Sequence, residues 1–167
     1  SIACGLIGRA VARIKEYPEP ERYFVAGLLH DIGRLVIFKS VPELGVYLLT
    51  SSAHHKKLLT DVEEETLGYD HSKLGGMLLR KWNFPFFIVM AVLNHHSPAK
   101  VKDDPMAPVT HLADIMAKGL GHGASKVFFV PRPDETALTQ VGLTSEDLDA
   151  VTQDLDENLD AFVDMLT

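Results

Sequence analysis

The sequence predicts an all-α protein, and three observations lead to this interpretation. Apolar residues recur at three- and four-residue spacing, as over residues 21–32, which is the periodicity of one helix face. Capping signatures stand ahead of several such segments, for example the Thr-x-x-Asp box at 144–147. Short strand-like stretches occur at 35–38 and 127–130, but no segment of the sequence pairs with them convincingly.

After the helical periodicity that follows Ser1, the first half of the chain contains three further predicted helices. One covers residues 21–32, and Gly33 is predicted to end it. The Ser-x-x-Glu box at 40–43 predicts the next helix, which runs to about residue 55. The Thr-x-x-Glu box at 60–63 predicts a short acidic helix that stops at Gly68.

The second half continues the helical pattern. Asp70 is a predicted N-cap for a helix with an apolar stripe over 74–82. Pro85 opens a nearly all-apolar helix that reaches the histidine pair 95–96, and apolar residues on every side predict a buried, central position. Another helix is predicted after Pro105 and Pro108. The final segment, 144–167, is predicted to be a helix that buries Leu148, Val151, Leu155, Leu159 and Phe162.

Length and composition predict one cytoplasmic domain. The 167 residues fit a single domain spanning 1–167, and 46% hydrophobic residues are enough for a core. The single cysteine, Cys4, excludes an intrachain disulfide and favours a reducing compartment. The longest apolar run is too short for the roughly 20 residues of a membrane helix. Because helical periodicity begins immediately after Ser1, we expect the domain to be truncated on its N-terminal side.

The charge distribution argues against nucleic-acid binding. The net charge is -7, and residues 133–167 contain ten acidic residues and no basic ones. Residues 1–132 contain 16 basic and 13 acidic residues without a dense basic patch. Nucleic-acid binders need such a patch to neutralise phosphates, so we expect neither a nucleic acid nor a membrane as partner.

Six histidines and aspartates lie on or near the ends of predicted helices whose apolar faces must share one core. Side chains on facing helices of a bundle build metal sites in this way. The alternative is that each is a hydrogen-bonded core residue, but six buried ionisable groups are costly unless they are paired or bind metal. The six candidate ligands are His30, Asp31, His71, His95, His96 and Asp114.

Imidazole and carboxylate ligands together predict one or two ions of Fe, Mn, Zn, Ni or Co rather than Ca. Asp31 has two carboxylate oxygens and can bridge two ions, which could then hold a phosphoryl group and activate a water. Arg34 stands one helical turn after His30 and is a candidate phosphate ligand. Lys73, near His71, is a second candidate. Asp31, Arg34 and Lys73 are therefore the predicted catalytic residues if the site is an enzyme's.

Motifs in sequence order resemble those of the HD superfamily, and most closely its HDOD branch in bacterial signalling proteins. The segment starting at Ala26, Ala-Gly-Leu-Leu-His-Asp-Ile-Gly-Arg-Leu-Val, is similar to the signature His-Asp-Ile-Gly-Lys. Further matches are Leu-Gly-Tyr-Asp-His-Ser-Lys-Leu-Gly-Gly from Leu67, Trp-Asn-Phe-Pro from Trp82, His-His-Ser-Pro from His95 and His-Leu-Ala-Asp from His111. The resemblance implies an HD-type helical bundle.

The resemblance also implies roles for individual residues. The six candidates match metal-ligand positions of catalytic HD domains, including HD-GYP phosphodiesterases, and the first superfamily ligand would fall just before Ser1. Arg34 replaces the usual lysine, which keeps the charge and changes its reach. The glutamate and Gly-Tyr-Pro run of HD-GYP proteins are absent after His96, where Ser-Pro-Ala-Lys occupies 97–100. This difference argues against hydrolysis of cyclic dinucleotides.

Two functions of different class remain open. One is a regulatory or interaction module of bacterial signal transduction that retains a divalent-metal site and has a signalling protein as partner. The other is a metal-dependent phosphohydrolase that acts on a nucleotide or another phosphate ester. The retained ligands favour the enzyme, while the missing HD-GYP elements and the HDOD resemblance favour the module.

Overall fold

The computed structural model describes residues 1–101, 103–122 and 129–166, with side chains up to residue 161. All regular structure in these ranges is helical, which confirms the all-α prediction. No described helix has the length and apolar character needed to cross a membrane. The elements are α1 (Ile2–Ile14), α2 (Pro20–Leu29), α3 (Ile32–Ser40), α4 (Pro42–His55), α5 (Leu59–Leu67), α6 (His71–Lys81), α7 (Phe86–Asn94), η1 (Pro98–Lys100), α8 (Met106–Gly119), α9 (Glu135–Val141) and α10 (Ser145–Leu166).

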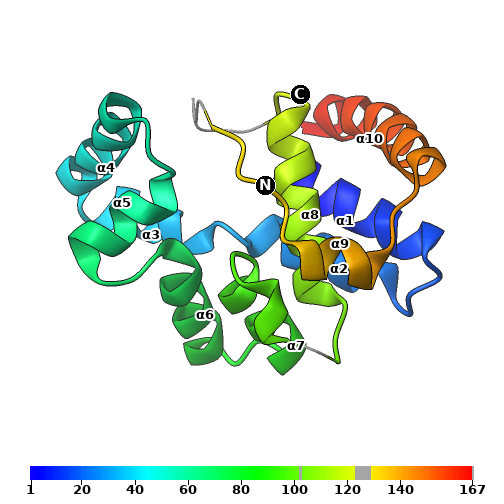
Figure 1. Cartoon of the computed structure of the whole chain (residues 1–167), viewed down its shortest axis with the longest axis horizontal. Coiled ribbons are helices and arrows are strands. Elements are labelled where there is room, and N and C mark those ends of the chain that lie inside the picture. Colours follow the sequence, from blue (N-terminus) through cyan, green and yellow to red (C-terminus); the bar gives the residue numbers. More distant parts are fainter. Residues whose placement is uncertain (102, 123–128, 167) are drawn as a thin grey trace.

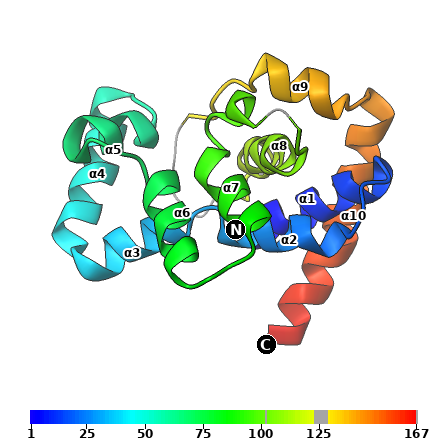
Figure 2. The same ribbon diagram turned by 90° about the horizontal axis from the view of Figure 1, so that it is seen from below.

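Two hydrophobic cores organise these helices. The larger core lies among α1, α2, α7, α8 and the last two helices, and Ile7, Val92 and Val109 are fully or almost fully buried in it. The smaller core, around Leu48 and Val62, holds α3, α4 and α5 together. Figure 1 shows α3–α5 on one side of the molecule and α1, α2, α8 and α10 on the other. Figure 2 shows α8 nearly end-on, enclosed by its neighbours.

The chain changes direction between the two cores at His30 and Asp31. The sequence predicted one helix over 21–32 ended by Gly33, and this was wrong, because α2 ends at Leu29 and α3 begins at Ile32. The strand-like stretch 35–38 belongs to α3. Of 127–130, only 129–130 are described, and they form no strand. The turn places His30 and Asp31 at adjoining helix ends, facing the space between the cores.

Gly33 serves close packing rather than helix termination. A Cβ atom built on this residue would lie 2.0 Å from the backbone oxygen of His71 and 2.8 Å from the backbone nitrogen of Gly75. Any larger residue would therefore push α3 away from α6. Since His71 starts α6, this contact also fixes the distance between Asp31 and His71.

Replacing Gly33 with alanine is expected to lower the free energy of unfolding by about 2–3 kcal/mol, because the added Cβ forces the backbone of α3 or α6 to move. Urea titration followed by circular dichroism measures this change. Gly119→Ala is the matched control, since a Cβ there meets nothing within 4 Å. Equal stability of the two variants would contradict the packing role of Gly33.

Two of the predicted helix caps are confirmed and two are wrong. The carboxylate of Asp70 accepts a hydrogen bond from the Lys73 N–H at 3.0 Å, and Thr144 and Asp147 form a reciprocal capping box. The expected box at 40–43 does not start α4, whose N-cap is Val41. The expected box at 60–63 does not form either, because the N-cap of α5 is Leu58, two residues before Thr60.

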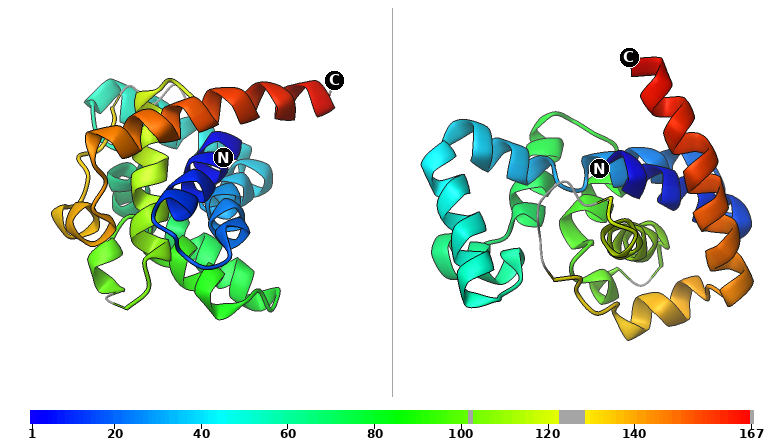
Figure 3. Two further views of the ribbon diagram at one scale, coloured as in Figure 1. Left: turned by 90° about the vertical axis from the view of Figure 1, so that its right-hand side faces the viewer. Right: turned by 90° about the horizontal axis from the view of Figure 1, so that it is seen from above.

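The C-terminal helix α10 packs as predicted over only part of its expected stripe. Val151 and Leu155 are fully buried, and Leu159 packs against the same core. Leu148 is 41% exposed, so its predicted burial was wrong, while the side chain of Phe162 lies outside the described residues. Figure 3 shows α10 running along α1 and extending past it. Helix α7 is likewise less enclosed than predicted, since Phe86 is 77% exposed.

Candidate metal centre

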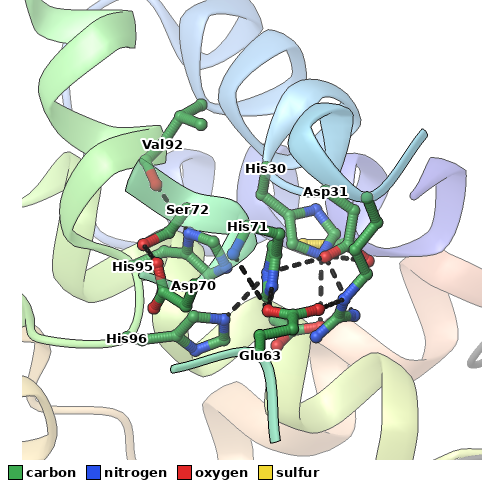
Figure 4. Close-up of polar contacts among 12 residues, drawn as sticks. His30, Asp31, Glu63, Asp70, His71, Ser72, Val92, His95 and His96 are labelled. Carbon is green, nitrogen blue, oxygen red and sulfur yellow. Dashed lines mark hydrogen bonds and ion pairs between the residues drawn. The ribbon is translucent and has the colours of Figure 1, made fainter. Parts of the chain in front are cut away.

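The structure brings all six predicted ligands together at the junction of the two cores. His30 follows α2, Asp31 precedes α3, and His71 is the first residue of α6. The remaining ligands come from the end of α7 and from the middle of α8. Figure 4 shows the histidines and Asp31 gathered around one point. The side chains of the set are buried or half-buried: His30, Asp31, His71, His95, His96 and Asp114.

Two carboxylates link the histidines. Asp31 lies between two rings, with Oδ2 3.2 Å from Nε2 of His30 and Oδ1 3.1 Å from Nε2 of His71. Oδ1 of Asp114 lies 3.2 Å from the same His30 nitrogen. These distances permit ion pairing, but Nε2 of His30 and Oδ1 of Asp31 have no partner with hydrogen-bond geometry. Nε2 of His95 is also buried without a partner.

In three histidines of the cluster, a hydrogen bond to Nδ1 fixes the orientation of the ring. Nδ1 of His30 lies 2.6 Å from the Gly27 carbonyl oxygen, and Nδ1 of His95 lies 2.7 Å from the Val92 carbonyl oxygen. A carbonyl oxygen only accepts, so each of these Nδ1 atoms carries the proton. Nε2 of a neutral His30 or His95 then presents a lone pair to the centre, which is the usual arrangement of a metal-bound histidine.

The third histidine is held by a glutamate that the sequence analysis missed as a site residue. Oε2 of Glu63 accepts hydrogen bonds from Nδ1 of His71 at 2.6 Å and from the His71 backbone N–H at 2.9 Å. Glu63 is fully buried and also accepts from Nε of Arg34 at 3.3 Å. The available signal was a carboxylate on the apolar stripe formed by Leu59 and Val62, where a solvated glutamate is out of place.

Three of the histidines, His71, His95 and His96, lie close enough together to hold a metal ion. Ligand nitrogens of His71, His95 and His96 all lie within 4.8 Å of one another. Nε2 of His71 is 3.0 Å from Nε2 of His96. Two neutral lone pairs at this distance repel, so either a proton or a metal ion belongs between the rings.

The electrostatics of the cluster favour a cation. Burial and the neighbouring histidines hold the pKa of His95 and of His96 well below the usual value, so both rings are neutral at pH 7. Burial alone would raise the pKa of Asp114, but contacts with His30 and Lys118 keep it well below its usual range. Burial alone would lower the pKa of His30, but the neighbouring Cys4, Asp31 and Asp114 hold it well above its usual value. In the metal-free protein three carboxylates therefore face three cations: Asp31, Glu63 and Asp114 against Arg34, Lys118 and the protonated His30. A divalent ion that displaces the His30 proton would take the place of this cation between Asp31 and Asp114.

Of the two predicted phosphate ligands, Arg34 lies in the cluster and Lys73 lies outside it. Nη1 of Arg34 lies 3.0 Å from Oδ1 of Asp31, and its Nε lies 3.3 Å from Glu63. Arg34 therefore joins the cluster as a bridge between carboxylates. Lys73 does not join it: the residue is exposed, and on α6 it stands two positions after His71, on a different face of the helix.

Two residues of α8, Lys118 and His111, contact residues of the cluster. Nζ of Lys118 lies 2.5 Å from Oδ2 of Asp114, a contact that the sequence analysis did not anticipate. His111 has a structural connection: its Nδ1 donates to the carbonyl oxygen of His95 at 2.7 Å, and its Nε2 accepts from the N–H of Asp134 at 3.0 Å. His111 thus joins the end of α7 to the start of α9 and leaves no nitrogen for a metal.

Acid should destabilise the metal-free protein through the buried glutamate. Hydrogen bonds from His71 and the charge of Arg34 hold the pKa of Glu63 below its ordinary value, against the opposing effect of burial. A carboxyl with a lowered pKa in the folded state stabilises the fold above its unfolded pKa, and this stabilisation is lost as the pH falls through the folded pKa. We expect the free energy of unfolding to decrease between about pH 5 and pH 3.

Urea unfolding of the metal-free protein across this pH range measures the effect. Glu63→Gln should flatten the pH dependence, because the amide does not titrate. The exposed Glu65→Gln on the same helix should leave it as in the wild type. An unchanged slope in Glu63→Gln would show that Glu63 does not contribute to the pH dependence.

Two cavities adjoin the cluster. One, of about 310 Å³, is bordered by α5, α8 and the segment after residue 128, and His96, Lys118 and Arg132 line it. The other, of about 430 Å³, lies against α2, α3 and α4, and His30 and Asp31 line it. Arg34, Asp114 and Lys118 border both cavities, so the cluster is accessible from two directions.

Comparison with known proteins agrees with this architecture. The family model described as "HDOD domain" matches residues 1–98. The chain belongs to the HDOD family. This confirms the family that the motif order indicated, and with it the HD-type helical bundle.

Two solved structures share the fold of this HDOD domain. One is a "putative phosphohydrolase" from Shewanella amazonensis SB2B, with a TM-score of 0.71, 18% identity and coverage of 93% of this chain and 56% of the other. The second is an "HDOD domain protein with unknown function" from Geobacter sulfurreducens, with a TM-score of 0.64, 20% identity and coverage of 97% and 57%. The chain therefore spans somewhat more than half the length of these proteins. No curated protein matches it.

Proposed function

We propose that this HDOD domain is a cytoplasmic regulatory module of bacterial signal transduction whose cluster binds one or two divalent ions. The observation that supports metal binding is a set of buried atoms in this cluster that have no hydrogen-bond partner: Nε2 of His30, Nε2 of His95 and Oδ1 of Asp31. Leaving such atoms without a partner is costly, and metal coordination satisfies all of them. Mixed nitrogen and oxygen ligands suit Fe, Mn, Zn, Ni or Co.

The surroundings of Arg34 favour a module over an enzyme. An arginine that binds a substrate phosphate needs free N–H groups, whereas this guanidinium already contacts Asp31 and Glu63. The residues after His96 also lack the glutamate and Gly-Tyr-Pro run of HD-GYP phosphodiesterases. In this proposal the ions hold α2, α3, α6, α7 and α8 in one arrangement that a signalling protein recognises.

A metal-dependent phosphohydrolase is the second candidate, and the cavity of about 310 Å³ is the observation that favours it. Lys118 and Arg132 border this cavity beside His96 and could contact a phosphate ester, while bound metal would offset the carboxylates that also line it. Bound metal would supply a water of lowered pKa, and Asp31 would orient the ions that hold it. The residues of this chain would then bind and position the phosphate.

A turnover assay distinguishes the two functions. The protein, loaded with Mn or Fe, is incubated with nucleotides and with p-nitrophenyl phosphate, and phosphate release is measured. We expect metal binding without turnover. Metal-dependent hydrolysis at about 1 per second or faster, lost in Asp31→Ala, would contradict the module and establish the enzyme.

A further inference from the structure

Helices α6 and α7 leave an apolar groove on the surface between them. Its volume is about 450 Å³, and it shares no lining residue with the two cavities beside the metal centre. Figure 1 shows the two helices next to each other at the lower edge of the molecule. Gly76 lets them approach closely, since a Cβ there would lie 2.9 Å from the Cβ of Leu93. Side chains of both helices line the groove, among them Met77, Arg80, Phe86 and Met90.

The apolar side chains of this groove are additional to those that build the core. Leu79 of α6 and Val92 of α7 are fully buried in the larger core. Met77 and Phe86 of the same helices are instead 63% and 77% exposed. They border one concave space together with Met90, so they differ from isolated apolar residues on a surface. A groove of this kind accepts the apolar face of an amphipathic helix, and flexible methionines adapt to its side chains.

The charge around the groove is positive, although the chain as a whole is acidic. Residues 71–101, which include both helices, contain four basic residues and no acidic one: Lys73, Arg80, Lys81 and Lys100. All four are exposed, and Arg80 lines the groove itself. None of the four forms an ion pair with another residue that the structure describes. A partner that places carboxylates beside Arg80 and Lys81 therefore complements this surface.

We propose that the α6–α7 groove binds an acidic amphipathic helix of a signalling protein. The apolar stripe of that helix contacts Met77, Phe86 and Met90, and its carboxylates pair with Arg80 and Lys81. This inference rests on the proposed regulatory role, for which it names the binding surface and the chemistry of the partner. It does not depend on bound metal.

Two other occupants fit the groove less well. The net charge of -7 opposes the approach of the chain to an anionic membrane, and the apolar residues border a hollow rather than a protruding face. A second copy of the chain offers the acidic helix α10, but Val151 and Leu155 of its apolar stripe are already fully buried in their own core.

Two synthetic amphipathic helices with the same apolar face test the charge preference. Each peptide has about 18 residues with leucine at three- and four-residue spacing, and the other positions are alanine with either glutamate or lysine. Fluorescence anisotropy should show the glutamate peptide binding at least about tenfold more tightly. The net charge of -7 by itself favours the lysine peptide, so this preference must come from the groove. About 0.5 M salt should reduce it by screening.

The apolar contact is tested by Met77→Ser combined with Phe86→Ser. This variant should bind the glutamate peptide at least about tenfold more weakly, because the apolar stripe loses its contact area. Both side chains are exposed, so the variant should fold, and its melting temperature verifies this. Val46→Ser, at a 61% exposed residue of α4, is the matched control that should bind like the wild type.

The charge contact is tested by Arg80→Glu combined with Lys81→Glu. This variant should lose the preference for the glutamate peptide, whereas Lys39→Glu, at an exposed residue near the end of α3, should retain it. Equal binding of the two peptides, no binding of either, or a preference that survives the charge reversal would overturn the inference. The titration needs no added metal, so these results would leave the proposed metal binding intact.

Two further measurements examine the other occupants. Flotation with phosphatidylserine vesicles and sedimentation velocity of the protein alone should show neither vesicle binding nor a dimer that Met77→Ser combined with Phe86→Ser abolishes. Vesicle binding lost in this variant would assign the groove to a membrane, and a dimer lost in it would assign the groove to a second copy. Either result would overturn the signalling helix as the occupant.

Discussion

Replacing Asp31 with alanine should abolish the rise in melting temperature that divalent metal causes in the wild type. A metal at about 100 times its dissociation constant stabilises the folded state by about 2.7 kcal/mol. For a domain of this size that corresponds to a rise of roughly 5–10 °C. Asp31 contacts both His30 and His71, so its loss removes the carboxylate that joins the two sides of the centre.

Differential scanning fluorimetry with and without Mn, Zn or Fe measures this rise. Comparing each variant with itself cancels any effect of Asp31→Ala on the metal-free protein. Asp156→Ala is the matched control, because this aspartate is exposed on α10 and far from the cluster in sequence. A rise in Asp31→Ala as large as in the control would show that Asp31 is not a ligand.

Replacing Glu63 with alanine should lower the free energy of unfolding by about 3 kcal/mol. Removing one partner of a buried ion pair typically costs about 3–5 kcal/mol, and the lower figure applies because Arg34 keeps its contact with Asp31. Glu65→Ala, which breaks an exposed pair with Lys57, should cost less than about 1 kcal/mol. Urea unfolding of the two variants makes the comparison.

Glu63 should also determine which nitrogen of His71 carries the proton. In the wild type the carboxylate accepts from Nδ1, which leaves Nε2 free to face the metal. Glu63→Gln keeps an acceptor and should preserve this tautomer, with metal affinity reduced about 10–100-fold. Glu63→Ala should shift the proton toward Nε2. The ¹⁵N chemical shifts of His71 report the tautomer, and identical shifts in all three proteins would refute this role.

The sequence predicted which side chains gather in the cluster because metal-ligand chemistry constrains residue type strongly. Histidines and aspartates that face a shared core are costly unless they pair or bind metal, and the ordered motifs placed them in a known family. Helix boundaries were less predictable. The break after Leu29 depends on α3 packing against α6 through Gly33, a contact between segments almost 40 residues apart that local periodicity does not contain.

Glu63 shows the other limit of sequence reasoning. The box at 60–63 has the composition of a helix start, and a capping role was the local interpretation. Its actual partners are His71 and Arg34, which only the tertiary fold brings to it. The contacts of Arg34, which was predicted as a phosphate ligand, with Glu63 and Asp31 were missed for the same reason.

Metal content, with the coordination of the bound ion, tests the central claim most directly. The protein is incubated with Mn, Fe or Zn and separated from free ions. Retained metal is then measured by mass spectrometry, and the ligand shell by X-ray absorption. We predict one or two ions for each chain, with imidazole nitrogen and carboxylate oxygen as ligands, and loss of metal in Asp31→Ala. No retained metal, or an all-oxygen shell unaffected by Asp31→Ala, would contradict the account.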